Sequence, residues 1–257
     1  MLIEVKDVTK RFGGLVAVNH LDMQVNKGEI LGLIGPNGAG KTTFFNVLSG
    51  YYKPTTGAII YRNQNIAGLK PSRIAEMGLV RTYQSAAVFP EMSIMDNLSL
   101  ANHLTVKPQF IEAVLNSKYY QSKEGKSYLW SRNILKDVGL VDYGNQIAKN
   151  LPYGRQKMLG LGMALACKPE ILLLDEPATG LNPDENKFMM NLIRVIRDSG
   201  VTIVIVEHNM KTIMELSDRV VVLNFGEKIA EGTPKEIMEN EKVIAAYLGS
   251  KKHVACD

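Results

Sequence analysis

Apolar and polar residues alternate near the start of the chain, which is the pattern of half-buried β-strands. The alternation covers 2–8 and 16–25, and the short segment RFGG at 11–14 lies between the two runs. Two such runs on either side of a glycine-containing turn predict an antiparallel β-subdomain. Shorter apolar runs at 58–62 and 78–84 predict further strands.

Helical periodicity first follows a glycine-rich loop. An apolar run at 29–35 leads into that loop, and residues 41–50 then have the spacing of a helix. The apolar face of this helix consists of Phe44, Val47 and Leu48, and Gly50 ends the helix. The sequence therefore predicts a strand, a loop and a helix in direct succession.

Residues from about 90 to 165 have mainly helical character. One helix is predicted after Ser93, which is a suitable N-cap residue, and others at 131–140 and 159–166. The polar stretch 105–128 has weak periodicity and fits either a loop or an inserted pair of helices. We expect this region to be a helical subdomain.

Strands and helices alternate strictly after residue 170. The predicted elements are a strand in 171–177, a helix at 183–199, a strand in 201–208, a helix at 209–217 and two short strands in 219–232. Apolar strands that alternate with helices predict a parallel sheet covered on both faces. We expect one domain over 1–257, in which 1–89 and 166–257 form a β-subdomain plus an α/β core of mixed sheet, and about 90–165 form the inserted helical subdomain.

The helix predicted at 183–199 has acidic residues at its start and arginines at its end. Asp184 and Glu185 suit the positive end of the helix dipole, and Arg194 and Arg197 suit the negative end. The face predicted to be buried consists of Phe188, Leu192, Val195 and Ile196.

Composition narrows the class of protein. The 257 residues are 46% apolar and 22% charged, which suits a globular domain. The net charge of +4 is scattered, which argues against a dedicated nucleic-acid surface. No apolar stretch approaches the roughly 20 residues that span a bilayer, and no signal-peptide region begins the chain. Cys167, Cys256 and four scattered histidines suggest neither a disulfide framework nor a metal cluster.

The segment GPNGAGKT at 35–42 is the strongest chemical signal. It fits the phosphate-binding pattern G-x-x-x-x-G-K-[ST], and it lies between a predicted strand and a predicted helix, as that pattern requires. Lys41 would reach the β- and γ-phosphates, the Thr42 hydroxyl would bind Mg²⁺, and Thr43 could contact the α-phosphate. The backbone N–H groups that would surround the β-phosphate belong to Asn37, Gly38, Ala39, Gly40, Lys41 and Thr42.

Two further strand ends carry polar residues. Asp175 ends the run ILLLD at the sheet edge where α/β proteins bind ligands, and it can hold Mg²⁺. Glu176 follows it and could orient and deprotonate an attacking water. His208 ends the run VTIVIVEH; a lone histidine there is more often structural, but beside the other motifs it indicates a γ-phosphate contact.

The segment LPYGRQ at 151–156, taken alone, is an ordinary helix start. Proline suits the first turn, and Gly154 suits a close backbone approach. Its place among the other motifs changes the interpretation. The order GPNGAGKT, RTYQ, LPYGRQ, LLLDEP, TGLNP and VEH resembles the nucleotide-binding subunit of an ABC transporter, from Val5 to about Gly232.

The resemblance implies ATP and Mg²⁺ as cofactors and roles for particular residues. Phe12 would stack on adenine with Val18 beside it, and Gln84 would contact Mg²⁺ or water where the helical subdomain begins. Glu176 would be the catalytic glutamate and His208 the switch histidine. GLVRTYQ, MSIMDNL, the polar insertion and YGRQ resemble the branched-chain amino-acid subfamily, which also includes importers of urea, amides and other small polar solutes.

The same resemblance places LPYGR where the family signature LSGGQ stands, so Tyr153 and Gly154 would face ATP bound to another subunit. Pro152 replaces the serine hydroxyl, and Arg155 would either add charge near the phosphate or pair with an acidic side chain. Met163 and Asn182 also depart from the arginine and aspartate of many relatives.

The implied partners are a second ATPase subunit in a head-to-tail dimer, either a copy or a paralogue, and two transmembrane permease subunits. A periplasmic solute-binding protein would act indirectly, and the chain would sit on the cytoplasmic face of the inner membrane. The apolar connection from Gln84 to about Asn97 would dock a permease helix, or else pack into the helical subdomain. The alternative class is a soluble ABC ATPase that acts on DNA or ribosomes, but the 110 residues from Lys41 to Leu151 contain no coiled-coil heptads.

Overall fold

The computed structural model describes residues 1–82, 88–103 and 118–249. The strands are β1 (Ile3–Phe12), β2 (Leu15–Val25), β3 (Ile30–Ile34), β4 (Thr56–Tyr61), β5 (Gln64–Asn65), β6 (Leu79–Arg81), β7 (Ile171–Asp175), β8 (Thr202–Val206), β9 (Arg219–Asn224) and β10 (Glu227–Gly232). The helices are α1 (Lys41–Leu48), α2 (Pro71–Glu76), α3 (Ile94–His103), α5 (Lys118–Asp137), α6 (Tyr153–Ala166), α7 (Pro183–Asp198), α8 (Met210–Leu216), α9 (Pro234–Met238) and α10 (Glu241–Gly249), with short 3₁₀ turns at Val141–Tyr143 and Ala148–Asn150.

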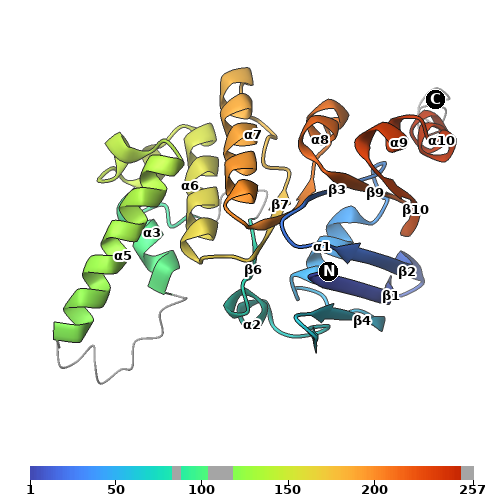
Figure 1. Ribbon diagram of the computed structural model, residues 1–257, viewed down its shortest axis with the longest axis horizontal. Coiled ribbons are helices and arrows are strands. Elements are labelled where there is room, and N and C mark those ends of the chain that lie inside the picture. Colours follow the sequence, from blue (N-terminus) through green and yellow to red (C-terminus); the bar gives the residue numbers. More distant parts are fainter. Residues whose placement is uncertain (83–87, 104–117, 250–257) are drawn as a thin grey trace.

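The strands form two sheets. One is antiparallel, with the order β2-β1-β4-β5, and contains the predicted hairpin of β1 and β2. The other has the order β10-β9-β3-β8-β7-β6 and is parallel except for the β9–β10 pair. The fold is therefore the expected P-loop core of mixed sheet with an antiparallel N-terminal sheet, and α3, α5 and α6 stand apart from both sheets on one side (Figure 1).

The central strands of the larger sheet, β3, β8 and β7, are buried on both faces, and for this reason their sequences are continuous apolar runs. In β3, Ile30 and Ile34 pack with the helices, whereas Leu31 and Leu33 pack with α1 and the antiparallel sheet. The predicted face of α1 is fully confirmed, since Phe44, Val47 and Leu48 are all buried in that second cluster. The P-loop helix is thus fixed between the two sheets.

The prediction for the buried face of α7 was partly wrong. Phe188 and Val195 are exposed, and the buried stripe is formed instead by Met189, Met190, Leu192, Ile193 and Ile196. The ring of Phe188 lies beside Gly139, where an added Cβ would stand 3.3 Å from Cζ. Phe188 therefore serves a contact with the turn after α5, and the sequence pattern did not separate this second contact from the core-facing stripe.

The stretch 105–128 is partly outside the described residues, which resume with α5 at Lys118. Gln84 also lies outside them, as do the apolar residues Ala86 and Ala87 of the expected docking segment and the C-terminal Cys256. The strand predicted at 78–84 is described only as β6, Leu79–Arg81. Among the described helices, none combines the length and apolar character needed to cross a bilayer.

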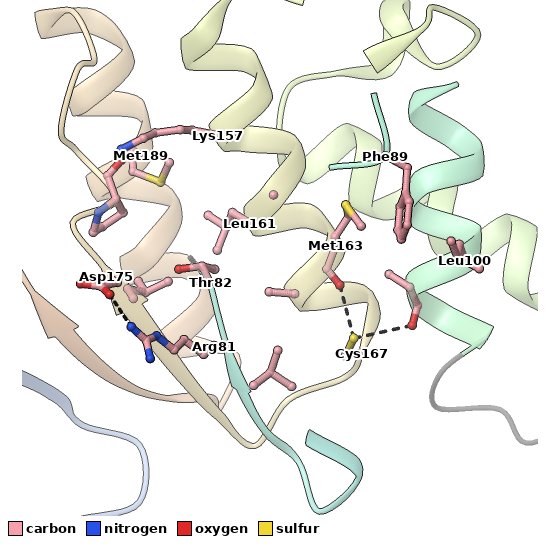
Figure 2. Close-up of a pocket in the computed structure, with 16 residues that line it drawn as sticks. Arg81, Thr82, Phe89, Leu100, Lys157, Leu161, Met163, Cys167, Asp175 and Met189 are labelled. Atoms are coloured by element: carbon pink, nitrogen blue, oxygen red, sulfur yellow. Dashed lines mark hydrogen bonds and ion pairs between the residues drawn. The ribbon is translucent and has the colours of Figure 1, made fainter. Parts of the chain in front are cut away.

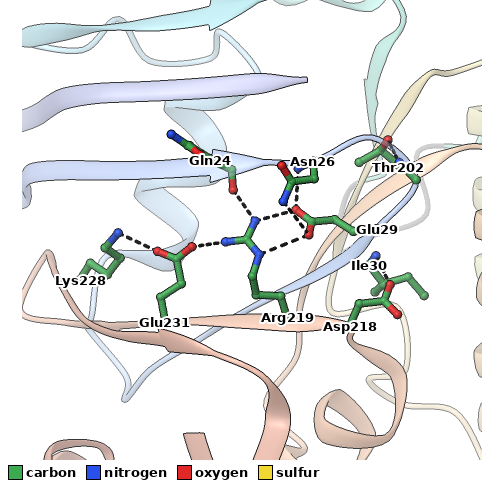
Figure 3. Close-up of polar contacts among 10 residues, drawn as sticks. Gln24, Asn26, Glu29, Ile30, Thr202, Asp218, Arg219, Lys228 and Glu231 are labelled. Carbon is green, nitrogen blue, oxygen red and sulfur yellow. Dashed lines mark hydrogen bonds and ion pairs between the residues drawn. The ribbon is translucent and has the colours of Figure 1, made fainter. Parts of the chain in front are cut away.

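An arginine at the start of β9 ties the two sheets together (Figure 3). The Arg219 guanidinium binds Glu29, Glu231 and the backbone carbonyl of Gln24 in β2. Burial alone would lower the pKa of Arg219, but the hydrogen bonds and charges of Glu29 and Glu231 raise it above its ordinary value. A largely buried arginine with these partners holds the antiparallel sheet against the core.

We expect Arg219→Met to lower the free energy of unfolding by about 2 kcal/mol, because it leaves Glu29 without its cation in a poorly hydrated site. Lys228→Met is the matched control, since Lys228 binds the same Glu231 from the more exposed end of the network. That control should cost less than about 1 kcal/mol. Urea unfolding measures both values, and equal midpoints for the two variants would contradict the assignment.

Candidate active site

The carboxyl ends of three parallel strands meet at one edge of the larger sheet. Leu33 of β3 and Asp175 of β7 both pair with Val206 of β8. The Glu176 N–H continues this ladder by donating to the Val206 carbonyl at 2.9 Å. The segments that follow β3, β7 and β8 therefore lie together where α/β sheets bind ligands.

The loop after β3 is shaped by close backbone approaches. A Cβ at Gly35 would stand 2.1 Å from the Leu223 carbonyl oxygen, and one at Gly40 would stand 2.3 Å from the Ala17 carbonyl oxygen. Gly40 has a φ of 99° and caps α1, whose first N–H groups open toward the loop. Only glycine fits these two positions, and the resulting concave loop suits an anion.

Lys41 is buried at the start of α1 and folds back over this loop. Its Nζ donates to the carbonyl oxygens of Gly35 at 2.7 Å and Pro36 at 2.9 Å. Burial lowers the pKa of Lys41, and the negative charge of Glu176 acts in the opposite direction. The ammonium is thus held at the loop by two neutral acceptors, which phosphate oxygens can replace with a stronger, charged interaction.

Asp175 is buried and paired with Arg81 of β6. Arg81 Nη2 lies 2.7 Å from Asp175 Oδ2, and Nη1 donates to Asn46 Oδ1 on α1 and to Ser49 Oγ at the C-cap of that helix. The ion pair adjoins a mainly apolar cavity of about 380 Å³ between β7, α3 and α6 (Figure 2). No role was predicted for Arg81 from the sequence, although its place in the RTYQ motif is a signal that could have identified it.

Glu176 and His208 form a close pair across the edge. His208 Nε2 lies 2.5 Å from Glu176 Oε1, and the Thr179 hydroxyl donates to Oε2 at 3.3 Å. Glu176 has a φ of 50°, an uncommon value for a residue with a side chain. The structure brings together the two side chains that the sequence placed on separate strands, and the carboxylate is oriented by both neighbours.

Glu207, next to His208, is a buried carboxylate that holds the segment after Glu176. It accepts a hydrogen bond from the Ala178 N–H at 2.7 Å. Burial raises the pKa of Glu207, while backbone N–H groups of Ala178 and His208 lower it. Lys157 of α6 reaches the same segment, and its Nζ donates to the Glu176 carbonyl at 2.9 Å. No role was predicted for Glu207 or Lys157 from the sequence.

The start of α6 contacts the segment that follows β7. Gly154 is buried, and a Cβ there would lie 2.3 Å from Glu185 Oε1, which belongs to the capping box of α7. The exposed Tyr153 ring lies against Gly180. The Arg155 guanidinium stacks over the Tyr143 ring at 4.1 Å, a contact that neither alternative for Arg155 anticipated.

The two residues expected beside adenine differ in exposure. Phe12 is exposed at the end of β1, with its ring edge-on to Tyr52 at 5.1 Å between centroids. Val18 is fully buried in the core beneath the antiparallel sheet. The methyl groups of Val18 fill this core, and its place beside adenine stays a prediction.

The polar groups at the edge fit a hard divalent cation that is shared with a ligand. Thr42 is exposed at the first turn of α1 and offers a hydroxyl, and Asp175 offers a carboxylate. Within the described ranges, no three His, Cys, Asp or Glu side chains group as an all-protein metal site. Mg²⁺ is commonly bound in this way, by one or two protein oxygens, waters and the phosphates of its substrate.

Comparison with known proteins gives a consistent result over nearly the whole chain. The ABC transporter family matches residues 18–179, and a branched-chain amino acid ATP-binding cassette transporter family matches residues 227–253. The chain is 43% identical over 249 residues to the high-affinity branched-chain amino acid transport ATP-binding protein LivG of Escherichia coli K12, covering 96% of this chain and 98% of LivG. It is 41% identical to the corresponding protein BraF of Pseudomonas aeruginosa, with the same coverage.

Solved structures of ATP-binding cassettes have the same fold as this chain. A nucleotide-free ATP-binding cassette from an ABC transporter superposes with a TM-score of 0.82 at 28% identity, over 96% of this chain and 98% of the other. The ADP conformation of the cassette MJ1267 superposes equally well, with 27% identity. The likeness extends over both sheets and the helical region, and not only over the P-loop.

We expect Lys41→Ala to weaken nucleotide binding by about 10-fold or more, because it removes the buried cation that would meet the phosphates. Equilibrium binding of a fluorescent ATP analogue measures the change. Lys168→Ala, at an exposed residue just after α6, is the control and should bind as the wild type does. Unchanged affinity in Lys41→Ala would contradict the phosphate-binding role of this loop.

Proposed function

The chain belongs to the ABC transporter family, and we propose that it is the ATPase subunit of an importer for branched-chain amino acids. The observation that carries the proposal is the convergence of the Lys41 loop, Asp175 and the Glu176–His208 pair at one sheet edge. The substrate class is supported by the names of LivG and BraF and by the match at residues 227–253.

The contacts at the edge support a division of roles. Lys41 would leave the Gly35 and Pro36 carbonyls and bind the β- and γ-phosphates of ATP. Thr42 and Asp175 would hold Mg²⁺, which offsets phosphate charge when bound. Glu176 would orient the attacking water and accept its proton, and His208 would hold the Glu176 carboxylate and contact the γ-phosphate. Gln84 is proposed as a further Mg²⁺ or water contact, outside the described residues.

A second ATPase subunit would complete each site. The N-terminus of α6 would present the backbone N–H groups near Tyr153 and Gly154 to ATP held by the partner's P-loop, with the helix dipole behind them. Pro152 has neither a hydroxyl nor an N–H, so it would shape the turn without binding. Arg155 would act through its stacking on Tyr143 and hold the first turn in place.

Two permease subunits would carry the solute, and the segment near Phe89 is the proposed docking surface. Phe89 is exposed, although its backbone is fixed because the buried Asn97 side chain binds both its N–H and its carbonyl group. Met92 is half-buried beside it. An exposed aromatic ring on a rigid backbone suits a docking site for an apolar helix.

The decisive experiment for the proposed function measures leucine uptake and ATP hydrolysis together. Glu176→Gln should reduce hydrolysis by about 10²-fold or more, because it removes the base but keeps the shape of the side chain. ATP binding should persist, and leucine uptake into membrane vesicles should fall in parallel with hydrolysis. If the wild-type transporter takes up another class of solute and does not take up leucine, the proposed substrate class is contradicted. Near-normal ATP turnover in Glu176→Gln would contradict the role of Glu176.

The role of Gly154 can be separated from its packing against Glu185. Gly154→Asp should reduce turnover by about 10²-fold or more in the assembled transporter, through bulk and charge beside the partner's γ-phosphate. Its side chain would also collide with Glu185 of its own chain. Adding Glu185→Ala removes that collision, and we expect the double variant to remain inactive while it binds ATP. Recovery of hydrolysis in the double variant would assign Gly154 to packing alone.

A further inference from the structure

Lys157 is a buried lysine on α6, one turn after the helix begins. Its Nζ donates to the backbone carbonyls of Glu176 at 2.9 Å and Pro177 at 3.4 Å. Lysine is seldom buried in a folded protein, because its ammonium loses hydration. Burial accordingly lowers the pKa of Lys157, and the charges of Glu207 and Glu176 counteract it. The buried ammonium is therefore held by two successive backbone carbonyls, those of Glu176 and Pro177.

Glu176, the first of these two residues, has an uncommon backbone conformation. Glu176 has a φ of 50°, a left-handed conformation that is disfavoured for a residue with a Cβ and persists only where its surroundings hold it. The Val206 carbonyl holds the N–H of Glu176, and Lys157 holds its carbonyl. The two contacts together fix the direction in which the Glu176 side chain leaves the backbone, toward His208.

We propose that Lys157 is a positioning residue for ATP hydrolysis, whose ammonium keeps the Glu176 peptide in the orientation that aims the carboxylate at the attacking water. The inference rests on the proposed role of Glu176 as the base. It explains why a cation, and not an apolar residue, occupies this buried place on α6.

Helix α6 also connects the Lys157–Glu176 contact to the proposed contact with the partner's ATP. Contacts of Lys157 with Glu176 and Pro177, and of the Tyr153 ring with Gly180, join α6 to the segment after β7, and Gly154 packs against Glu185 at the start of α7. The start of α6 is the proposed contact with the partner's ATP. Lys157 therefore links the nucleotide bound by the partner to the base that serves this chain's own nucleotide.

The test compares neutral and cationic replacements in the assembled transporter. Lys157→Met and Lys157→Gln should each lower kcat by roughly 10- to 100-fold with little change in the KM for ATP, because a misplaced base slows the chemistry and leaves the P-loop intact. Lys157→Arg keeps a cationic donor and should recover most of the rate. Lys168→Met, the same change at an exposed residue just after α6, should leave kcat unaltered.

A double-mutant cycle with Glu176→Gln separates positioning from folding. If Lys157 acts through Glu176, Lys157→Met should lower the residual rate of Glu176→Gln by less than about 2-fold. An equal loss in both backgrounds, or an unchanged kcat in a folded Lys157→Met or Lys157→Gln protein, would overturn the proposal. Since Glu176→Gln is measured in the same series, its failure to lose activity would refute the proposed function separately.

Discussion

The parallel register of β7 and β8 is the constraint on which the site depends. Asp175 pairs with Val206, and the Glu176 N–H then donates to the Val206 carbonyl, so the ladder extends one residue beyond β7. A slip of one residue would exchange the faces of all side chains on β7 and move Asp175 away from Arg81. The two-sided burial of these strands makes such a slip costly. The buried apolar strands β7 and β8 therefore set the positions of the polar residues Asp175 and Glu176 at the end of β7.

The site is neutralised internally before any nucleotide binds. Three buried or nearly buried carboxylates, Asp175, Glu176 and Glu207, are matched by the cations Arg81, Lys41 and Lys157. This balance makes the buried charges tolerable. Lys41 is bound to the Gly35 and Pro36 carbonyls and is attracted by the negative charge of Glu176, so the phosphates of ATP must compete with both interactions.

Local patterns in the sequence predicted the strands, the P-loop and the order of the motifs, because each depends on neighbours close along the chain. The alternation in β1 and β2 and the buried face of α1 were correct for this reason. The structure was needed for contacts between distant segments. Arg81 meets Asp175 across 94 residues, and Lys157 meets Glu176 across 19. The misplaced face of α7 has the same cause, because the contact of Phe188 with Gly139 is not encoded in the periodicity of the helix.

The most direct test of this account is a structure of the assembled transporter with ATP and Mg²⁺ bound, in which hydrolysis is blocked by Glu176→Gln. The account predicts that Lys41 Nζ has left the Gly35 and Pro36 carbonyls for phosphate oxygens, at about 2.8 Å. It also predicts that a backbone N–H near Gly154 of one ATPase subunit lies within about 3 Å of the γ-phosphate held by the other. A structure in which Lys41 keeps its carbonyl partners, or in which no residue of α6 approaches the γ-phosphate, would contradict it.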